Sequence, residues 1–158
     1  MAVYDPATYD IRTAVGPMLG RVRAAFLDAL DESLAPFDLK SADYLVLVAL
    51  ANDAADTASS VCSVLSHDPG AMTRKIDALE KRGLVRRVRS EADRRAIKLE
   101  LTAEGRKLYP RVLAAAVAIS NEFLEGFTKP EVRSLEGTLK RILDNAQARE
   151  MKKGRRVA

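Results

Sequence analysis

The side chains with the clearest chemical potential are basic, and they gather in one segment of the chain, residues 70–98. This segment holds 10 basic and 4 acidic residues, whereas residues 1–69 hold 4 basic and 10 acidic ones. Residues 149–158 are basic as well, with 5 basic residues and 1 acidic residue. Positive charge gathered in this way is typical of a surface that binds nucleic acid, although an anionic protein partner would also suit it.

The densest part of the basic segment is the sequence RSEADRRAIKLELT, residues 89–102. Arg89, Arg94 and Arg95 stand there with two acids between them, next to residues that alternate in polarity like a β-strand. A charge cluster of this kind is either a solvated turn or a loop that binds an anion. The elements that position the cluster must decide between the two.

The other reactive side chains are too few for catalysis or metal binding. Cys62 and His67 are the only residues of their types, so neither an internal disulfide nor a zinc site with three or four such ligands can form. Ser59, Ser60 and His67 do not make a convincing set of nucleophile, base and orienting group. We therefore expect no enzyme activity, no metal and no cofactor.

Length and composition predict a single domain over residues 1–158. Hydrophobic residues make up 47% of the chain, which is enough for a core built mostly from Leu, Val, Ile and Ala. No apolar run reaches the roughly 18 residues of a membrane helix. The N-terminus has no basic start followed by an apolar run. We therefore expect a cytoplasmic protein without a membrane partner.

The first half of the chain predicts two helices. Apolar residues at helical spacing run from Ile11 to Leu30, with a kink or a restart at Gly16-Pro17. Ser41 is expected to cap a short helix, ADYLVLVALA. That second helix is apolar on nearly every side, which predicts its burial.

A helix-turn-helix pattern follows. Thr57 or Ser59 is expected to cap the helix SVCSVLSH, and Asp68 to cap the next one, which Gly83 ends. This second helix has a narrow apolar face and a polar, basic one. The apolar face consists of Met72, Ile76 and Leu79. Two short helices joined by a tight segment predict a helix-turn-helix motif.

The rest of the chain predicts a hairpin and two long helices. GLVRRVR and AIKLELT have the pattern of two strands that form a β-hairpin. Thr102 is expected to cap a long helix that Pro110 kinks. The capping box Thr128–Glu131 starts the last helix, and residues 149–158 are expected to form a disordered basic tail.

The order of these elements, together with several short motifs, resembles the MarR family of bacterial transcription regulators. The motifs are Met72-Thr73-Arg74, IDALEKRGLVRR from Ile76 to Arg87, Asp93-x-Arg95-Ala96, and LTAEG from Leu101 to Gly105. The flanking helices extend the resemblance to nearly the whole chain, and Pro17 within the first helix departs from it.

The resemblance implies a mainly α fold with a small β-wing. It assigns a winged helix-turn-helix to residues 41–101 and dimerisation helices to residues 8–36 and 103–148. In the family, two subunits interlock these helices, and the homodimer binds palindromic double-stranded DNA. Open apolar faces agree with this, because such patches usually mark an interface. The residues expected at the dimer interface are Ile11, Val15, Val132, Leu135, Leu139 and Ile142.

The resemblance also suggests which residues contact DNA. Thr73 and Arg74 are candidates for the major groove, although a phosphate contact by Arg74 would position the helix without specifying a sequence. Gly70 would let the helix start approach the DNA backbone, or would only suit the helix start. Lys75, Arg86 and Arg87 would contact phosphates or simply lie on the surface, and Ser59 is a further expected DNA contact.

The charged stretch becomes the tip of the wing in this interpretation. A wing places its loop near the minor groove, where the negative potential attracts Arg. Asp93 can hold the guanidinium of Arg95 in a fixed orientation, which would explain an acid in a loop that contacts DNA. Arg94 has no such anchor, and we expect it to make a second contact with the minor groove or a phosphate.

The family's usual signal is a small molecule, often a phenolic compound or an aromatic carboxylate, bound between the dimer helices and the winged helix. Candidate ligand residues are Tyr9, Arg12, Met18 and Tyr44, although ordinary packing or surface exposure would explain each of them. We therefore expect a repressor whose affinity for DNA is tuned by a small effector.

Two alternatives stay open. Cys62 could make the protein a thiol-oxidation sensor, but its apolar neighbours favour burial, and no second cysteine exists to resolve an oxidised form. A protein-binding adaptor could keep the fold and give up DNA. Such an adaptor would be expected to lose Arg74, Arg94 and Arg95, which this chain keeps.

Overall fold

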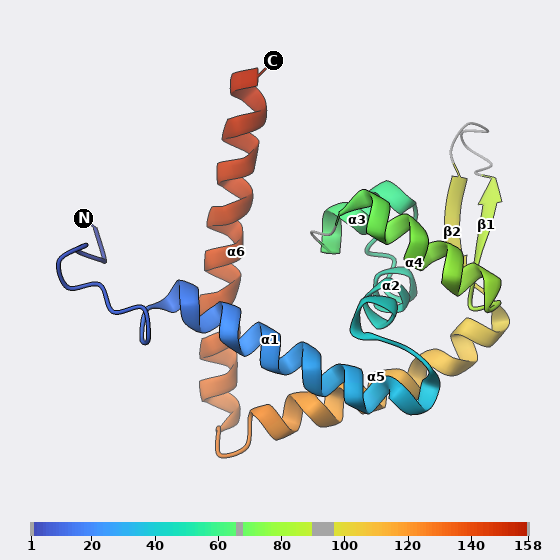
Figure 1. Ribbon diagram of the computed structural model, residues 1–158, viewed down its shortest axis with the longest axis horizontal. Helices are drawn as coiled ribbons and strands as arrows, with labels where there is room; N and C mark the ends of the chain where they lie inside the picture. Colours follow the sequence, from blue (N-terminus) through green and yellow to red (C-terminus); the bar gives the residue numbers. More distant parts are fainter. Residues whose placement is uncertain (1, 66–67, 90–96, 158) are drawn as a thin grey trace. The chain divides into compact units, whose positions relative to one another are not determined.

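A computed structural model describes residues 2–65, 68–89 and 97–157 of the chain. Its elements, in chain order, are α1 (Val15–Leu34), the 3-10 helix η1 (Ala35–Phe37), α2 (Ser41–Ala51), α3 (Ala58–Leu65), α4 (Pro69–Lys81), β1 (Val85–Arg89), β2 (Ile97–Leu101), α5 (Ala103–Phe123) and α6 (Lys129–Val157) (Figure 1). The chain divides into two compact units, Met1–Ser120 and Asn121–Ala158.

Helix α1 starts later than the apolar spacing predicts. Residues before it form turns, in which the Arg12 backbone N–H donates to the Asp10 carboxylate at 2.8 Å, and Ile11 therefore lies outside the helix. Pro17 occupies the first turn of α1. The first four N–H groups of a helix have no partner within it, so the missing N–H of proline costs little there. The restart at Gly16-Pro17 is thus the true beginning of the helix.

Helix α2 is capped by acids and not by Ser41, so that prediction is wrong. Lys40 is the N-cap residue, and its backbone N–H donates to the Asp43 carboxylate at 2.9 Å. The backbone N–H of Ser41 donates to the carboxylate of Asp31 in α1 at 2.6 Å. Burial raises the pKa of Asp31, but the hydrogen bonds from Ser41 and the positive charge of Lys40 together lower it by more, so the pKa lies below its usual value. An acid in α1 therefore fixes the start of α2.

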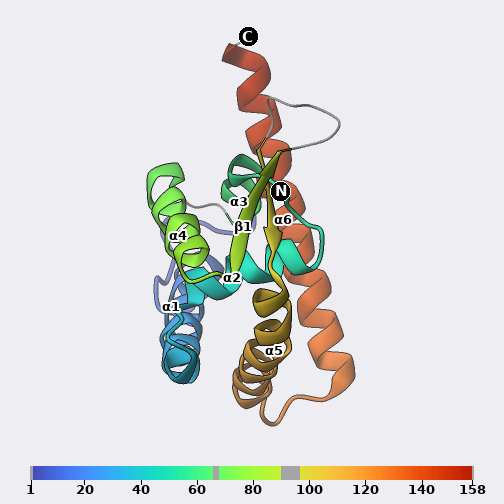
Figure 2. The ribbon, with the colours of Figure 1, turned by 90° about the vertical axis from the view of Figure 1, so that its right-hand side faces the viewer.

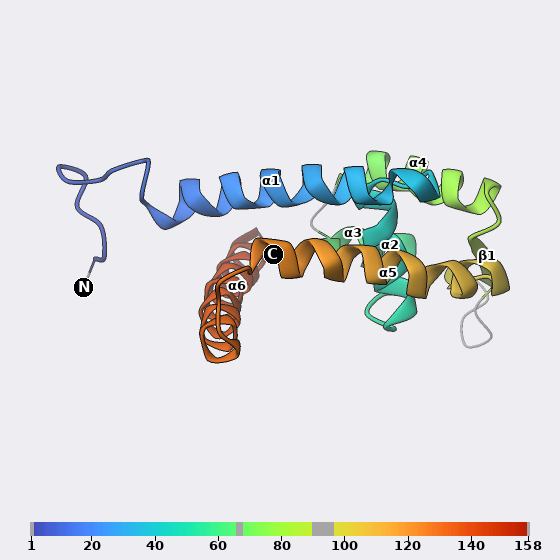
Figure 3. The same ribbon diagram turned by 90° about the horizontal axis from the view of Figure 1, so that it is seen from below.

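The core of the first unit forms around α2, whose predicted burial is confirmed. Figure 2 shows α2 running across the space between α1 and α5, and Figure 3 shows these two long helices from below. The largest fully buried side chains of the core are Leu30, Leu34, Leu39, Val46, Leu47, Val61, Met72, Ile76, Leu79, Val85 and Val112. Every helix from α1 to α5 contributes to this one core.

The helix-turn-helix has the predicted caps. The Ser60 backbone N–H donates to the Thr57 hydroxyl at 3.1 Å, so Thr57 rather than Ser59 caps α3. The Asp68 carboxylate accepts from Ala71 N–H at 2.8 Å, and Pro69 takes the first position of α4. Gly83 follows the helix with φ +68°, a conformation that suits glycine.

Strands β1 and β2 form the predicted antiparallel hairpin, in register from Val85↔Leu101 to Arg89↔Ile97. Thr102 caps α5, as predicted, by accepting from Gly105 N–H at 3.0 Å. A Cβ on Gly105 would lie 2.1 Å from the Leu84 carbonyl oxygen, so only glycine fits where α5 meets the wing. Helix α5 continues through Pro110 to Phe123.

The second unit consists of the end of α5 and the long helix α6. The predicted capping box starts α6, since Thr128 N–H donates to the Glu131 carboxylate at 2.8 Å. Residues 149–157 continue this helix, which corrects the expectation of a disordered tail. This segment contains no proline, and its Arg, Glu, Met and Lys residues favour helix. Among the described residues, no helix combines the length and the apolarity needed to cross a membrane.

Candidate nucleic-acid interface

The exposed face of α4 carries the predicted major-groove residues. Burial of Met72, Ile76 and Leu79 turns Thr73 and Arg74 toward solvent. The Thr73 hydroxyl donates to the Pro69 carbonyl at 2.9 Å, which leaves its oxygen able to accept a hydrogen bond. Arg74 makes no hydrogen bond or ion pair with any residue that the structure describes. Its five donors are available to an external acceptor such as guanine.

Gly70 and Ser59 are both exposed in the first turns of their helices. A Cβ on Gly70 would lie 3.2 Å from the Asp68 carboxylate oxygen that caps α4. The absence of a side chain at residue 70 therefore keeps the cap unobstructed, in agreement with the simple interpretation of Gly70 as helix-start chemistry. Ser59 points away from the core of α3.

Lys75 is engaged inside the protein. Its Nζ lies 3.4 Å from the carboxylate of Asp43, a buried acid near the start of α2. Asp43 also accepts a hydrogen bond from the Lys40 backbone N–H. Through these two contacts, one carboxylate links the start of α2 to the middle of α4. The ion pair occupies Lys75, whereas its neighbour Arg74 is free of such a partner in the described part of the chain.

The arginines of β1 are also paired. Arg86 donates to Glu100 on the opposite strand at 2.7 Å. Arg87 donates to Asp77 at 2.6 Å and to Glu80, both of which belong to α4. The Asp77 carboxylate, with Glu80 beside it, raises the pKa of Arg87. Two of the three arginines in β1 therefore form ion pairs within the protein.

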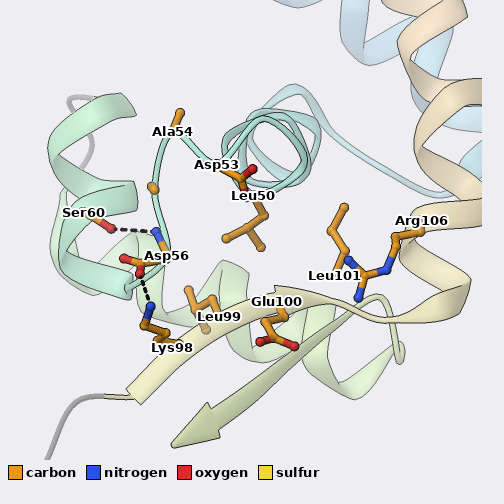
Figure 4. Close-up of a pocket in the computed structure, with 11 residues that line it drawn as sticks. Leu50, Asp53, Ala54, Asp56, Ser60, Lys98, Leu99, Glu100, Leu101 and Arg106 are labelled. Atoms are coloured by element: carbon orange, nitrogen blue, oxygen red, sulfur yellow. Dashed lines mark hydrogen bonds and ion pairs between the residues drawn. The ribbon is translucent and has the colours of Figure 1, made fainter. Parts of the chain in front are cut away.

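Strand β2 is joined to the turn between α2 and α3. The Leu99 backbone N–H donates to the Asp56 carbonyl at 2.7 Å, and Lys98 pairs with the Asp56 carboxylate at 2.9 Å (Figure 4). The hydrogen bond with Asp56 raises the pKa of Lys98. These contacts border a hollow of about 610 Å³, lined by Leu50, Asp53, Ala54, Ala55, Asp56, Ser60, Lys98, Leu99, Glu100, Leu101 and Arg106.

Comparison with known proteins agrees with this geometry. Residues 37–96 match the sequence model of the MarR family. The chain is 32% identical over 115 residues to the multiple antibiotic resistance protein MarR of Escherichia coli (strain K12), across 72% of this chain and 80% of that protein. The chain belongs to the MarR family.

Solved structures of MarR-family proteins share the fold. CouR from Rhodococcus jostii RHA1, bound to p-coumaroyl-CoA, is similar with a TM-score of 0.77 at 30% identity, over 85% of this chain and 95% of that chain. A mutant of MarR from E. coli in complex with operator DNA is similar with a TM-score of 0.72 at 30% identity, over 82% and 93% of the two chains.

MarR-family membership confirms several predictions from the sequence. The protein is a DNA-binding transcription regulator and not an enzyme. The mainly helical fold with a two-stranded wing is confirmed as well. Asp93, Arg94 and Arg95, the predicted tip of the MarR wing, lie outside the described residues, and their roles stay predictions.

The four candidate ligand residues do not gather in one place. Tyr9 and Arg12 lie exposed in the turns before α1, where Tyr9 packs edge-on against Tyr4 and Arg12 pairs with Asp10 at 3.0 Å. Met18 is exposed in α1. Tyr44 differs, because it lies half-buried against the core in α2.

Tyr109 of α5 was missed in the sequence analysis. Tyr109 of α5 accepts a hydrogen bond from the Asn52 side chain at 3.0 Å. Burial, and then the neighbouring Tyr109, raise the pKa of the Tyr44 hydroxyl. Tyr109 lies in the helix after the LTAEG motif, and its aromatic side chain in an Ala-rich helix was the only available signal.

The predicted dimer residues leave an apolar surface on each unit. Val15 in α1, and Leu135 and Ile142 in α6, are exposed, and Val132 and Leu139 are half-buried. Ile11 is exposed too, although it lies before α1 and not within it. A role for these residues at an interface stays a prediction.

Proposed function

We propose that this MarR-family protein is a homodimeric repressor that binds a palindromic operator and responds to a small effector. Each protomer would place α4 in the major groove and the tip of its wing, with Asp93, Arg94 and Arg95, near the minor groove. The relative solved in complex with operator DNA supports this mode of binding. Exposed apolar residues on α1 and α6 support the dimer.

The observation that carries the proposal is the state of Arg74. The next basic residue, Lys75, is paired with Asp43, yet Arg74 is exposed and has no partner among the described residues. A guanidinium presented in this way on a helix beside an exposed threonine suits bidentate contact with guanine. An adaptor that had given up DNA would have no need for it.

A salt titration tests whether DNA is the main partner. If the dimer neutralises roughly six to ten phosphates, the slope of log affinity against log salt should be about −5 to −9. Arg74→Ala should weaken operator binding by about 1–3 kcal/mol. Lys140→Ala, which removes a positive charge from α6, should have little effect. A slope near zero for the unaltered protein would instead favour the adaptor.

The effector part of the proposal points to Tyr44. Among the four candidates, Tyr44 is the one that packs against the core, which makes it the best placed to bind an aromatic compound, and CouR has been solved with the aromatic thioester p-coumaroyl-CoA. Phenolic compounds and aromatic carboxylates should be titrated into the protein–operator complex. Tyr44→Phe should keep DNA affinity and reduce release by the effector, whereas Tyr9→Phe should change neither. Equal release from both variants would remove Tyr44 from the site.

A further inference from the structure

The wing of this protein is tied to α4 by one arginine. The guanidinium of Arg87 in β1 donates to both Asp77 and Glu80, which lie one turn apart in α4. The backbone N–H of Arg87 donates to Glu80 as well, at 3.2 Å. Side chain and main chain of one strand residue therefore hold the second half of the recognition helix.

The neighbouring arginine shows that this arrangement is not a general property of the strand. Side chains alternate along β1, so Arg86 points to the opposite face, where it pairs with Glu100. The side chain of Arg86 is 58% exposed, against 31% for Arg87. Arg86 lies on the outer, solvent-exposed face of the wing, whereas Arg87 lies between the wing and α4.

The other strand of the wing is attached elsewhere. Asp56, in the turn between α2 and α3, accepts the Leu99 backbone N–H and pairs with Lys98 (Figure 4). The base of the wing is therefore held at two points, β2 at the α2–α3 turn and β1 at α4. Only the second point involves the helix that carries Thr73 and Arg74.

We propose that Arg87 is a positioning residue that sets the wing relative to the recognition helix and does not bind a DNA phosphate. This inference rests on the proposed function, in which α4 enters the major groove and the wing tip reaches the minor groove. The two contacts are then made on one piece of DNA at a fixed spacing. A guanidinium that joins β1 to α4 fixes the distance between the wing and the recognition helix before DNA binds. Binding then does not have to bear the entropic cost of ordering the wing.

The proposal predicts that neutralising Asp77 or Glu80 lowers the affinity for DNA, which is the opposite of what their negative charge would suggest. Asp77 and Glu80 are negative charges on a helix that approaches DNA, and simple electrostatics predicts that their neutralisation should strengthen binding. If they act by holding Arg87, neutralising them should weaken binding. Glu80→Gln and Asp77→Asn keep the shape of each side chain and so test the sign directly.

The first experiment measures operator affinity against salt for Arg87→Gln, Glu80→Gln and the double variant. We expect each single variant to bind about tenfold more weakly, with the slope against log salt unchanged. The double variant should be little weaker than Arg87→Gln, because Glu80 then has nothing left to hold. A salt slope that becomes less steep by about 1 for each altered protomer would show that Arg87 contacts a phosphate and would overturn the proposal. Tighter binding by Glu80→Gln would overturn it as well.

The second experiment separates the two grooves, with enough protein to saturate the operator. Methylation of guanine N7 reports the major groove, and hydroxyl-radical cleavage reports the sugars that line the minor groove. Arg87→Gln should lose protection at the wing positions and keep it at the guanines contacted by α4. General destabilisation would weaken both protections in parallel and would contradict the proposal.

Arg86→Gln is the matched control, because it removes the same charge from the next residue of the strand. It should keep protection in both grooves, and equal loss by both arginine variants would overturn a special role for Arg87. If Arg87→Gln is unfolded at the assay temperature, Glu80→Gln and Asp77→Asn carry the same tests. Absence of operator binding by the unaltered protein would instead count against the proposed function.

Discussion

The helices α2 and α6 both carry apolar side chains, but α2 is apolar on nearly every side whereas α6 has one apolar face, and their surroundings are opposite. In α2, Val46 and Leu47 are completely buried by elements of the same unit. In α6, Leu135 is 41% exposed and Leu143 is 62% exposed. The comparison teaches that an apolar pattern marks side chains that favour burial but not what covers them. The first unit completes its own core, whereas α6 has an apolar face that its own unit leaves open.

Exposed leucines on α6 carry a cost that a partner would remove. Fully burying one such side chain contributes about 1.5–3 kcal/mol, so several together can hold two protomers. The ion pairs of the winged helix-turn-helix, such as Lys75 with Asp43, fix the arrangement of its helices without a second chain. The two regions should therefore respond differently to the same kind of change.

The largest effect should follow deletion of residues 128–158, which removes α6. The first unit has its own core, so it should stay folded as a monomer while the dimer is lost. Operator affinity should fall at least about 100-fold, or about 2.8 kcal/mol, because the two half-sites are no longer bound together. Light scattering and circular dichroism would measure assembly and folding. A stable truncated dimer would mean that the interface lies elsewhere.

A pair of glycine variants compares the two regions directly. Gly105→Ala would push a Cβ to 2.1 Å from the Leu84 carbonyl oxygen, so it should lower the free energy of unfolding by about 3 kcal/mol. Gly137 lies in α6, and a Cβ there meets nothing within 4 Å. Gly137→Ala should therefore stabilise the protein, by about 0.5 kcal/mol. Denaturant unfolding measures both, and a large loss from Gly137→Ala would reveal a close partner at that face.

Local patterns in the sequence predicted most of the fold. The caps Thr57, Asp68, Thr102 and Thr128 were found because each capping side chain and the backbone N–H that donates to it lie three residues apart. The wing was found from alternation and the helix-turn-helix from spacing. Each of these signals is contained in one short stretch of chain.

Contacts between distant stretches could not be predicted in this way. The Asp31 hydrogen bond to Ser41 joins two helices, and nothing near Ser41 announces it. The Arg87 contacts with Asp77 and Glu80 join a strand to a helix, so the same arginine looked like any basic surface residue. Charge counting identified the basic segment, but it could not separate Arg74, which has no partner among the described residues, from Lys75, which is paired with Asp43.

Asp93 and Arg95, at the predicted wing tip, lie outside the described residues, and their predicted roles can be tested by mutation. Arg95→Ala should weaken operator binding by roughly 1–3 kcal/mol, the usual scale for one specific contact. Asp93→Ala should weaken it too if Asp93 orients Arg95, although removing an acid would otherwise help. A double-mutant cycle measures the coupling between the two residues. Tighter binding by Asp93→Ala would show that the acid does not act through Arg95.

The smallest effect should come from Cys62→Ser, within the self-contained region. Cys62 is half-buried in α3 and packs against the core, so its apolar neighbours restrict the access of an oxidant to the thiol. No second cysteine exists to resolve an oxidised form. We therefore expect the variant to keep operator affinity and effector response, with stability within about 1 kcal/mol of the unaltered protein.

Peroxide gives this last prediction its decisive measurement. The unaltered protein and Cys62→Ser should leave operator DNA to the same extent at each peroxide concentration, as followed by fluorescence anisotropy. Release of the unaltered protein alone would mean that Cys62 reaches solvent often enough to react, and that the core around α3 opens. The oxidation sensor would then lie inside the winged helix-turn-helix. The core of the first unit would then be less rigid than its buried side chains indicate.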